Sequence, residues 1–312
     1  MPPDRIAGFD HLRLLAMACV TVQHGLSVIG HYEWTQLLPG CTLGQFGVAI
    51  FCGLAGWFAL DSRREPGDWM VARLIRLFPA YWVATLLAFA LAVGVGRPVT
   101  AGLFVSQMLG LGYFSHGMAL VNVVSWFISL ILLCYALTLL ARLSPRPRLF
   151  MAAVSVGALA LVLSGIEIVL ARHVLAFAVA ASVAASGRPK LAPVAGSVVA
   201  LAAIVEPGLM VAGVALVLIG LFRTRVRPAE APVRVMAAHT YEYFLLHGLF
   251  LQAGVAVLGL SAAGLAFGLL ASMPAVILLK RFADAVRGRA RISGIRTDET
   301  PTRRGRSTRT VP

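Results

Sequence analysis

The chain has 312 residues, of which 59% are hydrophobic and only 13% are charged, and its mean hydropathy is +0.85. Soluble domains average about 25% charged residues, so this composition excludes an ordinary soluble protein and predicts a polytopic helical membrane protein. The net charge of +14 lies in short loops and in a basic C-terminal segment. Because this distribution follows the positive-inside rule, we expect a lipid bilayer and no nucleic acid as partner.

Apolar segments recur along the chain and mark the predicted helices. They cover about residues 11–30, 42–61, 71–95, 100–114, 119–141, 149–166, 168–186, 191–205, 208–222, 238–258 and 262–280. Most of them approach the roughly 20 residues that a helix needs to cross a bilayer. The first contains His24 and no convincing small-residue cleavage site follows it, so we interpret it as a helix and not as a signal peptide.

The basic residues indicate how many of these segments cross the membrane. If all crossed, the arginine-rich loop at 142–148 would face the outside. If the short segment 100–114 does not cross, all basic clusters fall on one side together with both termini. The opposite loops then carry His31, Glu33, Arg97, His116, Glu167, Arg172 and Glu206. We therefore predict an all-α bundle of about ten transmembrane helices in the inner (plasma) membrane, with both termini cytoplasmic and residues 97–118 external or re-entrant.

The end of the chain differs in composition from the rest. Residues 286–312 are rich in Arg, Pro, Gly, Ser and Thr and show no apolar periodicity. Such a segment cannot bury enough apolar surface to fold. We therefore expect a transmembrane domain over residues 1–285 and a basic, disordered cytoplasmic tail over residues 286–312.

Several kinds of site are not indicated by the sequence. The cysteines show neither metal-ligand spacing nor a disulfide framework; they are Cys19, Cys41, Cys52 and Cys134. The chain has no Walker loop, no HExxH and no GxSxG motif. We therefore expect no metal site.

The first apolar segment carries ionisable residues that are costly in a membrane. Asp10 and Arg13 are three residues apart at its start and can pair on one helix face. His24 follows Arg13 by eleven residues, which advance a helix by roughly 16 Å and about three turns, so both lie on one face. Alone, Arg13 fits an interfacial anchor and His24 a buried hydrogen-bonding residue. Their alignment favours a functional site.

Three further segments hold candidates. Arg73 and Arg76, in RLIRLFPAYW, share a face at the cytoplasmic boundary, where they fit either snorkelling side chains or a clamp for phosphates. The segment SWFISLILLCY contains Trp126 and Ser129, and Trp126 also fits an aromatic belt. The segment YEYFLLHGLF contains Tyr243 and His247.

In this order the motifs resemble the acyltransferase 3 family of membrane-bound O-acyltransferases. FDHLRLLAMACVTVQH is similar to the family's opening, an Asp-x-x-Arg followed by ten residues and a His. FGVAIFCGLAGWFAL resembles its second-helix pattern, and RLIRLFPAYW its Arg-x-x-Arg segment. SWFISLILLCY and YEYFLLHGLF resemble later family motifs, so the resemblance runs from about residue 8 to 280. Ala55, Trp57 and Leu132 depart from the usual Ser, Phe and acidic residue.

The resemblance implies transfer of an acyl group, most often acetyl, from acyl-CoA to a hydroxyl of a sugar, glycan or lipid-linked glycoconjugate, with no tightly bound cofactor. An alcohol is a weak nucleophile and needs a positioned base, for which a neutral His24 is suited. Arg73 and Arg76 would hold the CoA phosphates, and Arg13 would join them or stabilise the oxyanion. The supporting candidates are Asp10, Trp126, Ser129, Tyr243 and His247.

Two other classes of function stay open at this point. A transporter or flippase of a lipid-linked saccharide would also need buried Arg and His side chains. A structural or regulatory membrane protein without catalysis would fit the departures from the family motifs. Within the acyltransferase reading, direct attack and a covalent acyl-histidine are both open.

Overall fold

The computed structural model describes residues 6–166, 168–225 and 231–292, and most of them are helical. The elements are α1 (Ala7–Val28), η1 (Tyr32–Thr35), β1 (Gln36–Leu38), β2 (Cys41–Thr42), α2 (Leu43–Trp57), α3 (Pro66–Gly94), α4 (Ala101–Met108), α5 (Gly112–His116), α6 (Ser125–Leu143), α7 (Pro147–Leu163), α8 (Ile168–Ala185), α9 (Leu191–Leu201), η2 (Ala202–Ile204), α10 (Leu209–Arg225), α11 (Ala231–Ala238), α12 (Thr240–Leu258) and α13 (Ala262–Ile292). The two short strands pair antiparallel as a hairpin.

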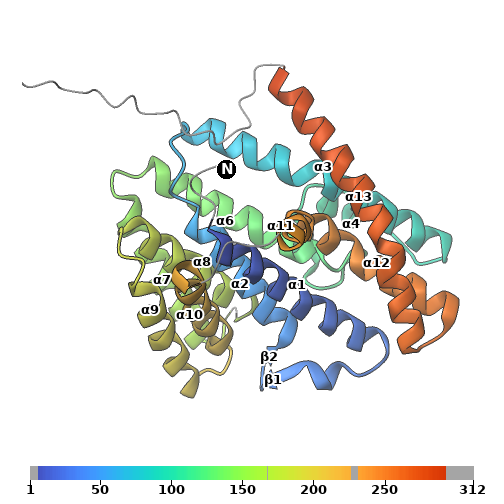
Figure 1. Cartoon of the computed structure of the whole chain (residues 1–312), viewed down its shortest axis with the longest axis horizontal. Coiled ribbons are helices and arrows are strands. Elements are labelled where there is room, and N and C mark those ends of the chain that lie inside the picture. Colours follow the sequence, from blue (N-terminus) through green and yellow to red (C-terminus); the bar gives the residue numbers. More distant parts are fainter. Residues whose placement is uncertain (1–5, 167, 226–230, 293–312) are drawn as a thin grey trace, which may run out of the picture.

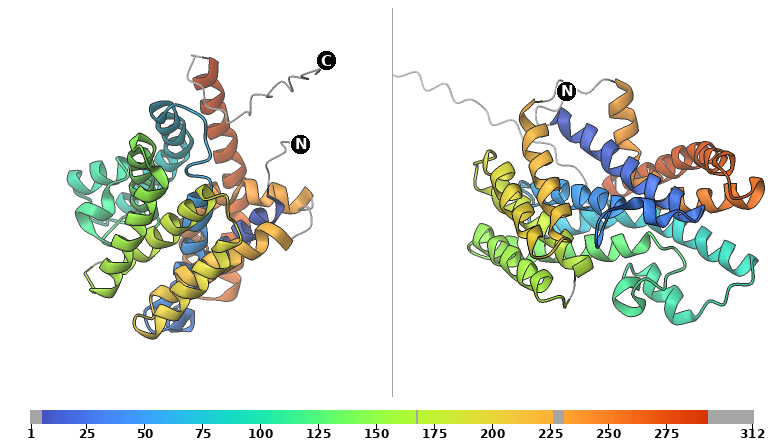
Figure 2. Two further views of the ribbon diagram at one scale, coloured as in Figure 1. Left: turned by 90° about the vertical axis from the view of Figure 1, so that its left-hand side faces the viewer. Right: turned by 90° about the horizontal axis from the view of Figure 1, so that it is seen from below.

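The helices form two groups on either side of a central layer (Figure 1). Helices α7, α8, α9 and α10 pack together on one side, and α12 and α13 form a hairpin on the other. Between them lie α1, α2 and α6, and α1 contacts α2, α10 and α12. The right-hand view of Figure 2 shows the same order from below. The helix that carries Arg13 and His24 is therefore central in the bundle.

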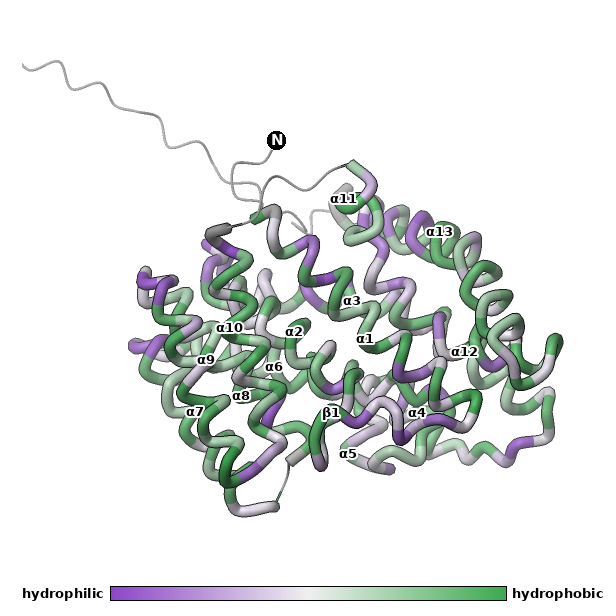
Figure 3. The backbone as a smooth tube through the Cα atoms, turned by 60° about the horizontal axis from the view of Figure 1, so that its bottom comes forward, coloured by the Kyte–Doolittle hydropathy of each residue, from purple (hydrophilic) through white to green (hydrophobic). Residues whose placement is uncertain are grey.

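The outer surface of the bundle is apolar. Hydrophobic residues predominate along the lengths of α7, α9 and α10 in Figure 3. Large side chains such as Val198, Ile204 and Leu270 are 63%, 86% and 72% exposed, respectively. Monomeric soluble proteins rarely expose so much contiguous apolar surface, whereas a bilayer covers it. The exposed apolar surface therefore agrees with the membrane protein expected from the composition.

The apolar segments of the sequence correspond to the longer helices. By length and hydropathy, four described helices could cross a membrane, namely α3, α6, α12 and α13, and five apolar helices are shorter, namely α2, α7, α8, α9 and α10. The segment expected not to cross, residues 97–118, contains only the short helices α4 and α5. The all-α prediction is confirmed, and the number of ten crossings stays a prediction.

Hydrogen bonds hold the two short helices against α3 and α6. The Ser129 hydroxyl on α6 donates to the Gly110 carbonyl at 2.7 Å and accepts from the Tyr113 backbone N–H at 3.3 Å. The buried Gln107 side-chain oxygen accepts from the Ser125 hydroxyl at 3.1 Å. On α3, Tyr81 donates to the Gln107 carbonyl. These hydrogen bonds pair several polar groups of the irregular segment inside the protein, where lipid could not.

The glycine-rich α2 packs closely on its neighbours. A Cβ atom at Gly56 would overlap the backbone carbonyl of Phe177 in α8, and one at Gly47 would overlap the carbonyl of Ala16 in α1. Small residues at such crossings let helix backbones approach closely. Helix α2 therefore packs closely against α1 at Gly47 and against α8 at Gly56.

Two expectations from the sequence are wrong in detail. Helix α13 continues to Ile292, so residues 286–292 are helical and not a disordered tail; residues 293–312 lie outside the described part. Arg172 does not lie in an outer loop, because α8 begins at Ile168 and Arg172 is buried within it. Its guanidinium donates to the Gly40 carbonyl at 2.8 Å, which satisfies part of its hydrogen-bonding capacity and ties α8 to the β1–β2 hairpin.

Candidate functional site

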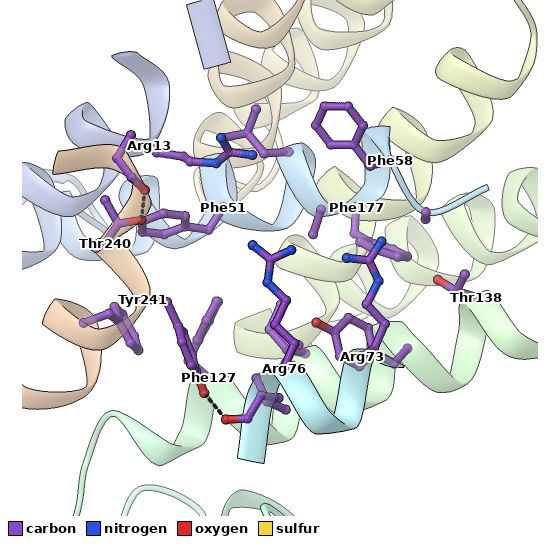
Figure 4. Close-up of a pocket in the computed structure, with 18 of the residues that line it drawn as sticks. Arg13, Phe51, Phe58, Arg73, Arg76, Phe127, Thr138, Phe177, Thr240 and Tyr241 are labelled. Atoms are coloured by element: carbon purple, nitrogen blue, oxygen red, sulfur yellow. Dashed lines mark hydrogen bonds between the residues drawn. The ribbon is translucent and has the colours of Figure 1, made fainter. Parts of the chain in front are cut away.

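A cavity of about 550 Å³ lies where α1, α2, α3, α6 and α12 converge (Figure 4). It is lined by Arg13, Phe51, Leu54, Ala55, Phe58, Ala59, Trp69, Arg73, Arg76, Leu77, Phe127, Ile131, Tyr135, Thr138, Phe177, Ala237, Ala238, Thr240, Tyr241, Phe244 and Lys280. The structure thus brings together all three arginines that the sequence singled out. They come from the N-terminal halves of α1 and α3.

The cavity is strongly cationic. Arg13, Arg73, Arg76 and Lys280 line it, and none of the described lining residues is acidic. Asp10, which is fully buried, forms a 2.8 Å ion pair with Arg13. This pair fixes the orientation of the Arg13 guanidinium and leaves a net positive cavity, because the three other cations also face it. Cations focused in a low-dielectric cleft attract anions strongly.

An aromatic residue positions one of these arginines. The guanidinium carbon atoms of Arg73 and Arg142 lie 5.5 Å and 5.5 Å from the Trp69 ring centroid. Trp69 is 2% exposed and packs edge-on against Tyr135, with the ring centroids 5.7 Å apart. A guanidinium over an indole face is held by a cation–π interaction. Trp69 therefore restricts the Arg73 side chain at the wall of the cavity.

A second site feature joins α1 to α12. Nδ1 of His24 lies 2.7 Å from Nε2 of His247, and the two ring planes differ by only 4°. The ring centroids are 4.9 Å apart. This exceeds the nitrogen–nitrogen distance by about the width of one ring, as expected when two rings meet through their edges and do not stack face to face. The rings therefore lie edge to edge in one plane and share a hydrogen bond. His247 is fully buried and His24 half-buried.

The backbone around His247 determines the direction of this hydrogen bond in a neutral pair. Nδ1 of His247 lies 2.8 Å from the Phe244 carbonyl and 3.2 Å from the Tyr243 carbonyl. Carbonyl oxygens only accept, so Nδ1 of His247 carries a proton and its Nε2 is an acceptor. His24 then donates from Nδ1, and its Nε2 keeps the lone pair. The arrangement prepares Nε2 of His24 to take a proton.

The cationic cavity and the histidine pair are separate. Neither His24 nor His247 lines the cavity among the described residues. The helical rise puts Arg13 and His24 roughly 16 Å apart along α1. The structure therefore has an anion-attracting region and a proton-accepting region at different depths of one helix.

The other candidates from the sequence have different surroundings. Tyr243 packs nearly parallel to His247, with centroids 5.7 Å apart. Ser129 binds the segment between α4 and α5, as described above. Trp126 contacts Tyr113 and His173 at centroid distances of 6.5 Å and 5.6 Å and does not line the cavity. Thus Tyr243 joins the histidine pair, whereas Ser129 and Trp126 do not meet the arginines.

Several residues at the site were not predicted from the sequence. Trp69, Tyr135, Tyr241 and Lys280 line the cavity, and the Tyr241 hydroxyl donates to the Leu77 carbonyl of α3 at 2.8 Å. Their sequence signal was weak because aromatic residues and lysine at a helix end are also typical of the membrane interface.

An apolar helical bundle with a cationic cavity, and with an imidazole pair that joins α1 to α12, has the character of a membrane protein with an internal polar site. A family model described as an acyltransferase domain matches residues 6–281. The chain therefore belongs to the acyltransferase 3 family and is a multi-pass membrane acyltransferase. No curated protein and no solved structure matches it.

Proposed function

We propose that the protein is an O-acyltransferase that moves an acetyl group from acetyl-CoA to a hydroxyl of a sugar, glycan or lipid-linked glycoconjugate. In this proposal ten helices cross the inner (plasma) membrane, and both termini are cytoplasmic. The observation that carries the proposal is the placement of three arginines around one cavity, with His24 farther along α1 from Arg13 and hydrogen-bonded to His247 of α12.

The cationic cavity supports binding of the donor. Acetyl-CoA carries several phosphate charges, and guanidinium groups bind phosphate oxygens in bidentate geometry. Arg73 and Arg76 on α3 face Arg13 on α1 across the cavity (Figure 4). With the phosphates held there, the extended pantetheine arm would carry the thioester along α1 toward His24.

His24 would act as general base. Its Nε2 takes the proton of the acceptor hydroxyl while the hydroxyl oxygen attacks the thioester carbonyl carbon. The tetrahedral intermediate then collapses, the carbon–sulfur bond breaks, and the CoA sulfur leaves as a thiolate. The imidazolium of His24 returns its proton to that thiolate. The products are the O-acetyl ester and CoA, and the imidazole is neutral again.

His247 would orient and stabilise this base. Its Nε2 accepts the hydrogen bond from Nδ1 of His24, which holds the ring in one tautomer. When His24 becomes an imidazolium, the same bond becomes charge-assisted and strengthens. His247 therefore stabilises the charge that develops in the transition state, although it touches no reacting atom.

A transporter or flippase of a lipid-linked saccharide was the alternative from the sequence. Family membership favours acyl transfer, and no feature of the described residues favours transport. Membranes that contain the protein should transfer the label of acetyl-CoA, radiolabelled in its acetyl group, to an added glycan or glycolipid. Membranes without the protein should not. Movement of a glycolipid across the membrane that does not require acetyl-CoA would contradict the proposal.

A further inference from the structure

Three phenylalanines from three helices close one wall of the cationic cavity. Phe51 on α2, Phe127 on α6 and Phe244 on α12 all line it. The ring centroids of Phe51 lie 6.3 Å from Phe127 and 6.3 Å from Phe244, and the last two are 4.8 Å apart. Each ring contacts both others, so the three form a continuous aromatic cluster, here called the phenylalanine triad.

One member of the phenylalanine triad, Phe244, contacts both the cavity and the histidine pair. Phe244 lines the cavity, and its ring centroid is also 5.8 Å from that of His247. The two residues are three apart on α12, on one helix face. His247 in turn bonds His24 and does not line the cavity. The side of the cavity next to the histidine pair is therefore formed by a member of the triad.

Buried aromatic clusters commonly serve only to fill a core. The phenylalanine triad differs in its position, because all three members line the cavity and one also touches the histidine pair. Figure 4 shows Phe51 and Phe127 at the cavity together with Arg13 and Arg76. The triad is thus an apolar part of a lining that also holds cationic side chains.

We propose that the phenylalanine triad is a gate that the acyl thioester passes and that restricts the donor to short acyl groups. The inference rests on the proposed acyltransferase function and adds its acyl-chain specificity. An acetyl group requires a small opening between the three rings, whereas a longer chain must force well-packed side chains apart. The closed triad also keeps water from the thioester next to His24, which limits hydrolysis.

The first test measures the acyl chain preference of variants with a smaller ring. Phe51→Leu, Phe127→Leu and Phe244→Leu each keep an apolar side chain but open the triad. In each, the ratio of kcat/KM for butyryl-CoA to that for acetyl-CoA should rise by about tenfold, because a single methylene in an apolar pocket already discriminates by about 10- to 200-fold. An unchanged ratio in variants that still transfer acetyl would overturn the gate.

A matched control is available on α3. Phe89 is 5% exposed and packs edge-on against Phe104 at 5.0 Å, but it does not line the cavity. Phe89→Leu makes the same chemical change in a buried aromatic pair elsewhere in the bundle. The acyl chain ratio of this variant should equal that of the unmodified protein. A rise as large as in the triad variants would mean that general loosening of the bundle, and not the gate, changes specificity, and would overturn the inference.

A second measurement does not depend on acyl transfer. In a His24→Cys chain, a small membrane-impermeant thiol reagent is added to the membrane face that carries Arg73 and Arg76. The native cysteines are all buried, so the parent chain gives the background. Adding Phe244→Leu should speed modification of position 24 several-fold, and adding Phe89→Leu should not.

The two measurements separate the gate from the proposed function. Faster modification in the triad variant supports the gate even if no acyl transfer is found, in which case only the proposed function fails. Equal modification rates in the triad and control variants overturn the gate, whether or not acetyl transfer occurs.

Discussion

Nδ1 of His24 lies 2.7 Å from Nε2 of His247, a hydrogen bond between residues 223 positions apart. It joins the central helix α1 to α12, and the carbonyl of Phe244 fixes the proton on the far side of the His247 ring. Because a polar pair in lipid is costly unless it is satisfied, this bond both stabilises the bundle and determines the tautomer of His24. His247 therefore determines which nitrogen of His24 keeps its lone pair.

The first prediction concerns His247. Replacing it by Phe removes the acceptor for Nδ1 of His24, so the imidazolium loses a charge-assisted hydrogen bond of about 1.5–3 kcal/mol. We expect kcat for acetyl transfer to fall by about 10- to 100-fold, with the KM for acetyl-CoA unchanged. Steady-state kinetics with labelled acetyl-CoA measure both values.

A conservative change at the same position separates orientation from packing. His247→Gln keeps a side-chain acceptor in reach of His24 and should recover part of kcat. If His247→Gln is as slow as His247→Phe while both variants fold, the hydrogen bond does not orient the base.

The second prediction concerns the arginines of the cavity. Arg73→Gln and Arg76→Gln each remove a guanidinium that would bind CoA phosphates, a charged hydrogen bond of about 1.5–3 kcal/mol. We expect the Kd for CoA to rise by about 10- to 100-fold. Calorimetry in detergent measures this, and the salt dependence of binding should weaken in both variants.

Arg148 provides the control for charge alone. It is an exposed residue in the first turn of α7 and does not line the cavity. Arg148→Gln removes the same charge and should leave the Kd for CoA unchanged. Equal weakening in all three variants would mean that the net charge, and not the cavity, binds CoA.

The third prediction concerns the crossing of α2 and α8. A Cβ atom at Gly56 would overlap the Phe177 carbonyl, so Gly56→Ala forces two helix backbones apart. Overpacking of this kind costs about 1–3 kcal/mol, and the melting temperature in detergent should fall. Gly157 in α7 has open space at its Cβ position. Gly157→Ala should therefore leave the melting temperature equal or higher, since alanine favours a helix by about 0.5–1 kcal/mol.

The fourth prediction concerns Ser129. Its hydroxyl is buried and bonds Gly110 and Tyr113, so Ser129→Ala removes a buried hydrogen bond to each of these two residues. We expect the free energy of unfolding to fall by about 1–3 kcal/mol and the KM for acetyl-CoA to stay unchanged. Ser164→Ala, at an exposed position, should have neither effect. If the KM for acetyl-CoA rises in Ser129→Ala and not in Ser164→Ala, Ser129 contributes to substrate binding and this prediction is wrong.

The helices were predictable because their signal is local. Apolar runs of membrane length predicted where most of the long helices lie, and the charge pattern separated residues 97–118 from the rest. The continuation of α13 to Ile292 was missed because its last turns are basic and polar, as a disordered tail would be. The β1–β2 hairpin was missed because its strands have three and two residues, too short for an alternating pattern.

The site was only partly predictable because its contacts are long-range. The spacing of Arg13 and His24 placed both on one helix face, and the motif order suggested that Arg73 and Arg76 act with them. No local pattern says that α12 packs on α1, so the sequence could not predict that His247 bonds His24. The phenylalanine triad could not be predicted for the same reason, because its members come from three helices whose packing has no local signal.

The central claim is that His24 is the base of acyl transfer, and the acetyl transfer rate of His24→Ala tests it most directly. The variant and the unmodified protein are compared in membranes at equal amounts, with labelled acetyl-CoA and a glycan that the unmodified protein acetylates. We predict a loss of kcat of about 10²- to 10⁴-fold, with the Kd for CoA unchanged, because general-base catalysis contributes that much and the proposed CoA site lies at the arginines. Transfer by His24→Ala at the unmodified rate would contradict the account.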